Sequence, residues 1–369
     1  MGHWTWKSLL AEPVALLVSV SAAACAFLLV MFFEAVYAGE SEQIVAYVNQ
    51  ADADVWVMQR GVANMHMASS YLADWKVEEI ASVEGVAAAE PILYLNTVIT
   101  SGSHQWFAYV VGLDTPSVLG GPWAMVAGAA EPEDGEVVVP AVFADMSGLA
   151  LGDLLRITDR DFTVVGFSED TFSMANSVVF VTKTDLEDVM TSLDILSYVL
   201  VKAAPGVAPE TLAAAIEGAV EKVHALPADQ FVINDRRMAM QMGVETIALM
   251  TVIGGALAAL LVAFTIYSQI ARQRRELAVA KALGVTHGAL YGSVLVQALL
   301  ITVASVVLAT LMAWVVMPVA TAFIPQVTLK LTAASVLRIA LLGGGVALLA
   351  ALVPSRQVAR VDPVSAFHG

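Results

Sequence analysis

Four long apolar runs constrain this chain more than any other feature, because one stands near the start and three follow after a wide gap. They cover residues 13–33, 244–270, 289–317 and 334–353. A helix needs about 20 mostly apolar residues to cross the hydrocarbon core of a bilayer. Each run reaches that length. The chain is therefore expected to be a membrane protein with four transmembrane helices.

The segment between the first two runs, residues 34–243, has the composition of a domain in water. It holds 30 of the 34 acidic residues of the chain and 9 of the 18 Lys and Arg residues. An acidic surface of this kind repels phosphates, so nucleic acid is excluded as a partner of this domain. The chain as a whole is 58% hydrophobic and 14% charged, whereas soluble domains are nearer 25% charged.

Basic residues of the short segments predict the orientation in the membrane. Lys7 precedes the first run, four basic residues lie between the second and third, and Arg356 and Arg360 follow the fourth. Lys and Arg concentrate in cytoplasmic loops. Both termini are therefore expected in the cytoplasm, and the large domain outside it.

The expected fold is an α-helical membrane protein, four transmembrane helices with a large α+β extracytoplasmic domain between helices 1 and 2. Hydrophobic periodicity predicts strands at 54–58, 87–100, 106–113, 196–201 and 231–233, and helices at 71–83 and 209–224. Four short strands are expected at 136–140, 154–158, 162–167 and 178–182. The predicted divisions are 1–33 (N-terminus and first helix), 34–243 (core domain) and 244–369 (second, third and fourth helices). Within the core domain, α/β halves at about 34–114 and 195–243 flank an inserted β-rich module at about 115–194, interpreted as all-β.

Motifs for catalysis are missing from the sequence. It has no Gly-x-x-x-x-Gly-Lys-Ser/Thr loop for nucleotide phosphates and no metalloprotease or serine-hydrolase motif. Cys25 is the only cysteine and lies inside the first apolar run, so the external domain has no disulfide. The chain is expected to bind no cofactor and to have no catalytic residues of its own.

Two clusters in the external domain allow more than one interpretation. Asn64–Met67, with Met58 nearby, offers soft side chains that could hold copper, although such residues usually pack in a core. The aromatic residues Trp56, Tyr71 and Trp75 could line a hydrophobic substrate path or form ordinary core.

A basic amphipathic segment follows the second run, at residues 271–285. Its first half carries the charges, and Leu277, Ala280 and Leu283 continue an apolar stripe that ends near Gly284. These features fit either an anchor on the inner membrane surface or a helix that docks a protein.

Two stretches resemble FtsX-like ABC transporter permeases, the group that includes MacB-type exporters. The first is the basic segment, with Arg275-Glu276, Lys281-Ala282 and Leu283-Gly284 in the family order. The second is residues 354–367, which match the closing Pro-x-x-x-Ala-x-x-x-Asp-Pro-x-x-Ala pattern of the family. The DevC-like permeases, which have no fused ATPase, are the most similar in layout.

The resemblance implies a permease subunit that couples ATP hydrolysis by a separate cytoplasmic ATPase to extracytoplasmic movement. Such mechanotransmission exports or extracts an amphiphilic, lipid-linked or peptide substrate. The alternative is a mechanotransmitter that moves no substrate and regulates a cell-envelope enzyme. The substrate, the choice between homodimer and heterodimer, and the use of an adaptor stay open.

The same resemblance implies the location, partners and site residues. The chain would lie in the bacterial cytoplasmic (inner) membrane, in contact with its lipid, beside a second permease subunit in a homodimer and above an ABC ATPase dimer that binds ATP and Mg. A periplasmic adaptor protein is a further candidate partner. The implied coupling helix, which docks the ATPase, contains Arg272, Arg274, Arg275, Glu276, Lys281 and Gly284, and the C-terminal family motif contains Pro354, Arg360, Asp362 and Pro363.

Overall fold

A computed structural model describes residues 13–66, 68–172, 177–192, 194–239, 245–272, 279 and 283–360. The chain divides into two compact units. The first, the helical unit, is formed by Met1–Gly39, Thr246–Ile324 and Leu329–Gly369. The second, the mixed α/β unit, is formed by Glu40–Glu245 and Pro325–Thr328.

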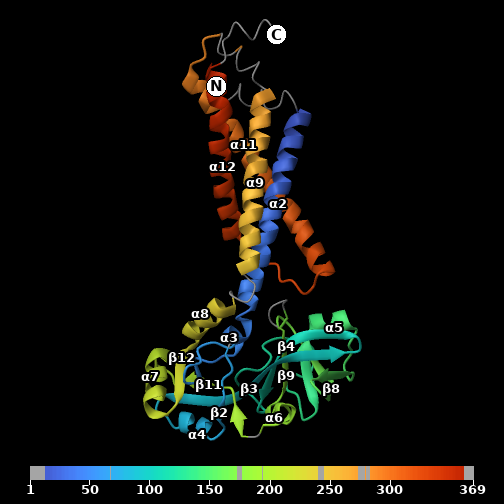
Figure 1. Ribbon diagram of the computed structural model, residues 1–369, viewed down its shortest axis with the longest axis vertical. Coiled ribbons are helices and arrows are strands. Elements are labelled where there is room, and N and C mark those ends of the chain that lie inside the picture. Colours follow the sequence, from blue (N-terminus) through green and yellow to red (C-terminus); the bar gives the residue numbers. More distant parts are fainter. Residues whose placement is uncertain are drawn as a thin grey trace. The chain divides into compact units, whose positions relative to one another are not determined.

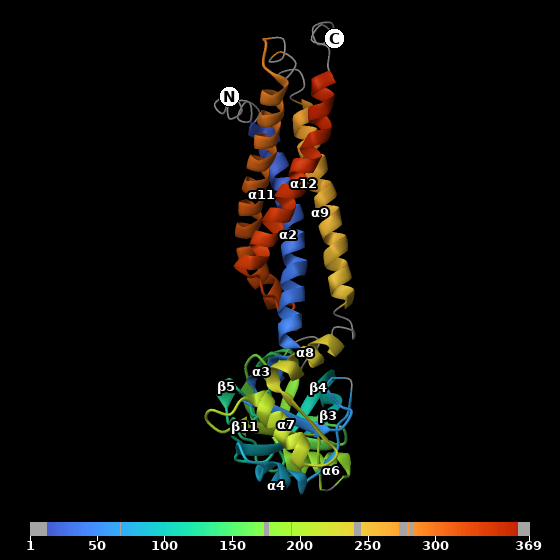
Figure 2. The same ribbon diagram turned by 90° about the vertical axis from the view of Figure 1, so that its left-hand side faces the viewer.

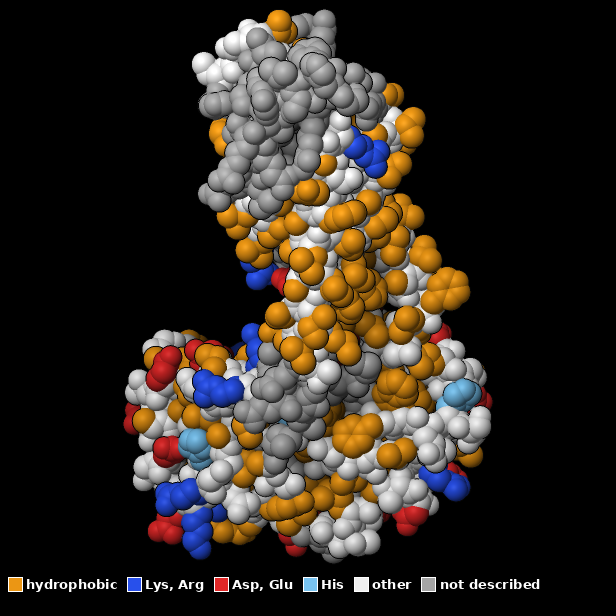
Figure 3. Space-filling view, turned by 45° about the horizontal axis from the view of Figure 1, so that its top comes forward, with side chains coloured by type: hydrophobic (Ala, Val, Ile, Leu, Met, Phe, Trp, Pro, Cys, Tyr) orange, Lys and Arg blue, Asp and Glu red, His pale blue; other side chains and the backbone are white. Residues whose placement is uncertain are grey.

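Four helices of the helical unit are long and apolar enough to cross a membrane, which confirms the predicted spans. They are α2 (Pro13–Gln43), α9 (Glu245–Arg272), α11 (His287–Phe323) and α12 (Ala333–Arg360). α2 continues ten residues beyond the first apolar run. Apolar side chains dominate the described surface of these helices (Figure 3).

The chain direction alternates within the helical unit. α2 and α11 run one way, and α9 and α12 run the other (Figures 1 and 2). The beginning of α2, the end of α9, the beginning of α11 and the end of α12 therefore lie at one end of the unit. These are the helix ends that adjoin the predicted cytoplasmic segments in the sequence.

Small residues let the spans approach each other closely. A Cβ atom on Gly343 of α12 would lie 2.3 Å from the Phe27 ring of α2, and one on Gly254 of α9 would lie 3.0 Å from the Phe33 ring. Without a hydrophobic driving force between helices in lipid, such close packing is the main attraction. Both glycines therefore hold α9 and α12 against α2 within one subunit.

The mixed unit is built on a ten-stranded sheet in the order β12-β1-β11-β3-β4-β9-β6-β8-β5, with β7 paired to β3 and β8. Its strands are β1 (Val55–Gln59), β3 (Val86–Ser101), β4 (His104–Leu113), β5 (Met125–Gly128), β6 (Glu136–Pro140), β7 (Leu154–Ile157), β8 (Arg160–Ser168), β9 (Val178–Thr182), β11 (Tyr198–Ala203) and β12 (Val223–Pro227). The β4–β9 and β6–β8 pairs are parallel and the others are antiparallel. A separate small sheet pairs β2 (Leu72–Ala73) with β10 (Ile195–Leu196).

Short helices cover both faces of this sheet. They are α3 (Ala46–Gln50), α4 (Lys76–Ala81), α5 (Ala141–Ser147), α6 (Lys183–Met190), α7 (Pro209–Ala219) and α8 (Ala228–Ala239). Successive residues of β1 point to opposite faces, so Val55 packs in the core beside α7 while Trp56 packs in the core beside α3 and α8. Burial on both faces explains why this strand reads as a continuous apolar run.

The predicted strand at 231–233 is wrong, because these residues belong to α8. Phe231 and Asp235 are both fully buried, at the i, i+4 spacing of one helix face. A three-residue apolar run is too short to distinguish a strand from a helix. The predicted helix at 209–224 also ends early, since α7 stops at Ala219 and β12 begins at Val223.

The segment predicted as an all-β insertion contains two helices, α5 and α6. Thr182 caps α6, its hydroxyl accepting a hydrogen bond from the Asp185 amide at 3.1 Å. This Thr-x-x-Asp pattern is a recognisable helix start that the strand-based interpretation overlooked. The strands of the segment also join the main sheet, since β9 pairs with β4 and β7 pairs with β3.

Candidate functional site

The described members of the predicted docking and motif set lie at the end of the helical unit where α9 and α12 end and α11 begins (Figure 1). Arg272 is the last residue of α9, and Gly284 lies in a turn before α11 with a φ of +90°. At this φ a Cβ atom is strained, so glycine suits the position. Pro354 and Arg360 lie in α12. Arg274, Arg275, Glu276, Lys281, Asp362 and Pro363 lie outside the described residues.

The two segments that connect the mixed unit to the spans meet on one core. α3 follows the end of α2, and α8 precedes α9; the two helices contact each other. Phe231 of α8 stacks on Trp56 at 4.8 Å between ring centroids, and Tyr47 of α3 meets the same indole edge-on at 6.1 Å. Trp56 is therefore core, while Tyr71 and Trp75 are 51% and 59% exposed.

A buried His–Asp pair ties α8 to the segment that follows β1. The Asp235 carboxylate accepts the amide hydrogens of Met65 and His66 at 2.7 and 3.2 Å, and its other oxygen lies 2.9 Å from His66 Nδ1. Asp235 is fully buried and His66 nearly so. Each contact replaces a hydrogen bond to water that the carboxyl group loses on burial, so the pair fixes α8 to the segment after β1.

Tyrosines enclose this pair. The ring of Tyr109 meets His66 edge-on at 5.1 Å, and the hydroxyl of Tyr198 donates to the Asn64 carbonyl at 3.2 Å. Burial raises the pKa of Tyr198 and Tyr109 far above the ordinary value, so both phenols stay neutral.

The described side chains considered as copper ligands contribute to packing, and Met67 lies outside the described residues. Met58 and Met65 are buried in the core around Trp56, and Asp235 occupies Nδ1 of His66. Among the described residues, no group of three or more His, Cys, Asp or Glu side chains could hold a metal ion.

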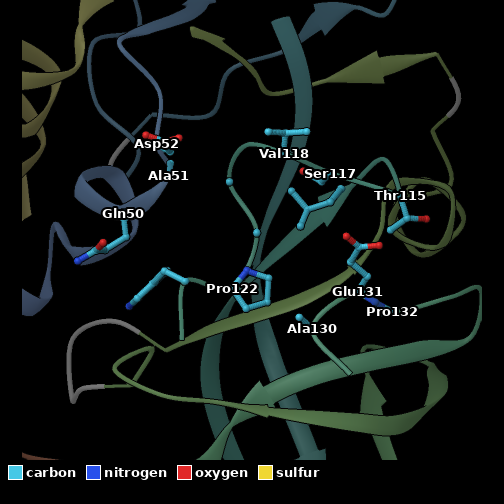
Figure 4. A pocket seen from close by; sticks show the side chains of 14 residues that line it. Gln50, Ala51, Asp52, Thr115, Ser117, Val118, Pro122, Ala130, Glu131 and Pro132 are labelled. Atoms are coloured by element: carbon cyan, nitrogen blue, oxygen red, sulfur yellow. The ribbon is translucent and has the colours of Figure 1, made fainter. Parts of the chain in front are cut away.

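A groove of about 190 Å³ opens beside the end of α3, between the chain after β4 and residues 130–132 (Figure 4). Gly120 shapes its wall: its φ is +77°, and a Cβ atom there would lie 2.6 Å from Leu200. Glu90 holds the adjoining loop by accepting hydrogen bonds from the Ser117 hydroxyl and the Leu119 amide, both at 2.9 Å. Asp52 and Glu131 bring carboxyl groups to the rim, and Lys202 Nζ pairs with Asp52 Oδ1 at 2.7 Å. The described lining holds no histidine, cysteine or lysine.

An ion pair near one end of the spans was not predicted from the sequence. Arg338 Nη2 of α12 donates to Glu34 Oε1 of α2 at 2.7 Å and to the Ser335 hydroxyl at 3.2 Å. In the same region, the Lys330 amide donates to the Ala35 carbonyl at 3.0 Å. Glu34, the first charge after the first apolar run, was the available signal. These contacts attach the start of α12 to α2.

Comparisons with known proteins agree with this architecture. A family model described as MacB-like periplasmic core domain matches residues 15–219, and one described as FtsX-like permease C-terminal matches residues 248–363. An uncharacterised ABC transporter permease of Mycobacterium tuberculosis is 25% identical over 330 residues, which cover 87% of this chain and 86% of the relative. An uncharacterised ABC transporter permease of Mycobacterium bovis is 23% identical over 323 residues, with the same two shares of 87% and 86%. The solved periplasmic region of MacB from Actinobacillus actinomycetemcomitans aligns at a TM-score of 0.38 and 13% identity, over 52% of this chain and 96% of that one.

Proposed function

Because the chain belongs to the FtsX-like ABC transporter permeases that carry a MacB-like periplasmic core domain, we propose that it converts ATP hydrolysis on a separate ATPase into movement of its own extracytoplasmic domain. A permease of this type is a multi-pass inner-membrane protein, and it works with an ATPase partner. ATP and Mg would bind only to that partner. The movement would export or extract an amphiphilic, lipid-linked or peptide substrate.

The observation that carries the proposal is the packing of α3 against α8. α3 follows the first span and α8 precedes the second, and both contribute to the core around Trp56. A close-packed core transmits displacement instead of absorbing it. A change in the separation of α2 and α9 would therefore be transmitted to the sheet through the core around Trp56.

The sequence of the spans favours transmission over conduction. No Asp, Glu, Lys or Arg lies between Glu245 and Arg272 or between His287 and Phe323. An ion or proton relay needs ionisable groups at mid-depth in the membrane. The Glu34–Arg338 pair lies near one end of the spans instead, where it would couple movement of α12 to movement of α2.

The remaining parts of the proposal concern assembly. With both termini in the cytoplasm, Arg272, Gly284 and the residues between them would form the coupling helix on the ATPase. An ATPase dimer presents two equivalent docking surfaces, so two permease subunits would pair about a two-fold axis. The acidic external domain, with the groove at Asp52 and Glu131, would meet the substrate or an adaptor.

Purification of the tagged full chain from native membranes tests this function. We expect an ABC ATPase to co-purify in equal amount, with a complex mass that accounts for two permease chains and two ATPase chains. Identification of the other bound proteins and lipids then separates transport from regulation. Co-purification of a periplasmic adaptor would support transport. Co-purification of a cell-wall hydrolase, with no bound substrate, would instead indicate that the permease regulates that enzyme. Recovery without any ATPase would contradict the coupling.

A further inference from the structure

The helical unit contains an apolar groove of about 170 Å³ that the proposed mechanism does not use. Three helices form its walls. The lining residues are Phe27 and Val30 of α2, Gly255, Ala258, Ala259 and Val262 of α9, and Ile339, Leu342, Gly343 and Val346 of α12. None of these side chains carries a polar atom.

The groove lies within segments that have the length and composition of membrane spans. Its surroundings in a bilayer are hydrocarbon, and an unfilled space would deprive the lining atoms of dispersion contacts. Water is a poor occupant, because it needs polar partners. An acyl chain can supply the missing contacts.

A charged group stands at one end of the groove. Arg338 precedes Leu342 by four residues, and Glu34 follows Val30 by four, so the Glu34–Arg338 ion pair lies one helical turn beyond two groove walls. The Arg338 side chain is 66% exposed and the Glu34 side chain 18%. The carboxylate thus faces inward, and the guanidinium keeps donors for a further partner. A guanidinium binds phosphate oxygens through two parallel hydrogen bonds.

The dimensions fit a lipid of one leaflet. From Arg338 to Val346 the groove follows α12 for about 12 Å, at 1.5 Å per residue. One leaflet contributes about half of the roughly 30 Å hydrocarbon core. A chain in the groove therefore stays in the leaflet whose headgroups lie at the level of Arg338.

We propose that this groove binds one acyl chain of a bilayer glycerophospholipid, with the lipid phosphate on Arg338. The lipid would fill the space between α9 and the α2–α12 pair and so would set how far α9 can move toward them. This role is independent of ATPase docking. It would hold for the permease alone.

Two glycines provide a matched test. A Cβ atom would meet nothing within 4 Å at either Gly255 or Gly345, but only Gly255 lines the groove. Gly255→Leu places a side chain in the groove, whereas Gly345→Leu places the same side chain on the exposed surface of α12. Ala259→Leu is a second filling variant from another position on α9.

The probe is a phosphatidylglycerol with a photoreactive diazirine on its acyl chain, in vesicles that contain the full-length permease. We expect the wild type and Gly345→Leu to be labelled on peptides of α2, α9 and α12. Gly255→Leu and Ala259→Leu should lose these labels but keep the general labelling of the exposed face of α11. Arg338→Gln should reduce groove labelling by phosphatidylglycerol more than labelling by an uncharged diacylglycerol probe.

Three results would overturn the proposal. Labelling of the filled variants equal to that of wild type would show that the groove takes no chain. Cross-links between two copies at these residues would show that a second subunit covers it. An equal effect of Arg338→Gln on both probes would show that Arg338 does not bind the lipid phosphate.

Discussion

At the scale of single residues, Asp235 makes several contacts that hold the mixed α/β unit together. One buried carboxylate accepts two backbone amides and contacts an imidazole, and it does so from the helix that leads into α9. Removing one partner of such a pair leaves buried groups unsatisfied and costs about 3–5 kcal/mol. The same loss would release α8 from the segment after β1.

We therefore predict that Asp235→Ala lowers the stability of the full chain by about 3 kcal/mol and frees the amides of Met65 and His66. Hydrogen exchange of the peptide covering residues 61–70 should accelerate, and the unfolding midpoint should fall. Asp229→Ala is the matched control, because Asp229 is exposed on the same helix and only supports its first turn. Unchanged exchange in Asp235→Ala would show that the carboxylate does not hold this segment.

At the scale of elements, the close contact between α12 and α2 depends on one glycine. The neighbouring Gly344 has open space at its Cβ position, whereas Gly343 faces the Phe27 ring. The three consecutive glycines 343–345 identify this contact only as a patch. Which of them touches a neighbour depends on the rotation of α12, which hydropathy does not determine.

Gly343→Ala should push α12 away from α2 and destabilise the bundle by about 1–3 kcal/mol, the usual cost of overpacking. Gly344→Ala should be neutral or stabilising by up to about 1 kcal/mol, because alanine favours helix more than glycine does. Thermal unfolding in detergent measures both changes. Phe27→Leu should rescue Gly343→Ala if the ring is the obstacle; a failure of rescue would assign the contact to another residue.

The sequence predicted those elements whose hydrophobic pattern extends over many neighbouring residues. Four spans, the β3–β4 hairpin and the strands β6 and β9 follow from apolar runs and turn residues that lie next to each other in the chain. It did not predict α8, because the apolar run at 231–233 is short enough to fit a strand or a helix. The burial of Phe231 and Asp235 comes from Trp56 and His66, which are far away in sequence. The Glu34–Arg338 pair was missed for the same reason, since its partners are 304 residues apart.

At the scale of the whole molecule, the basic loops predict that the mixed α/β unit and the α9–α11 connection lie on opposite sides of the membrane. Asp134 and Gly288 are both exposed and belong to different units. In a Cys25→Ala background, a cysteine at position 134 should react with an impermeant reagent from outside the cell. A cysteine at position 288 should react only after the membrane is opened. External labelling of both would reverse the assignment of the α9–α11 loop to the cytoplasm.

The segment between α9 and α11 allows a test of coupling to an ATPase, because the two interpretations of its basic charges predict opposite effects. Glu276 is the one acid among Arg272, Arg274, Arg275 and Lys281. If the segment only anchors to anionic lipid, Glu276→Lys adds positive charge and strengthens the anchor. If it docks on a protein, the reversed charge meets a surface selected for a carboxylate, and a like-charge contact across an interface costs several kcal/mol.

We expect docking, so Glu276→Lys should insert normally, because an exposed charge adds little to folding stability. It should bind its ATPase about tenfold more weakly or worse, since about 1.4 kcal/mol suffices for a factor of ten. ATP hydrolysis by the reconstituted complex, titrated with ATPase, measures both binding and stimulation. Glu84→Lys makes the same charge change on an exposed site of the mixed unit and should alter neither. Wild-type affinity and stimulation in Glu276→Lys would leave the segment as a lipid anchor and move the docking surface elsewhere on the cytoplasmic side.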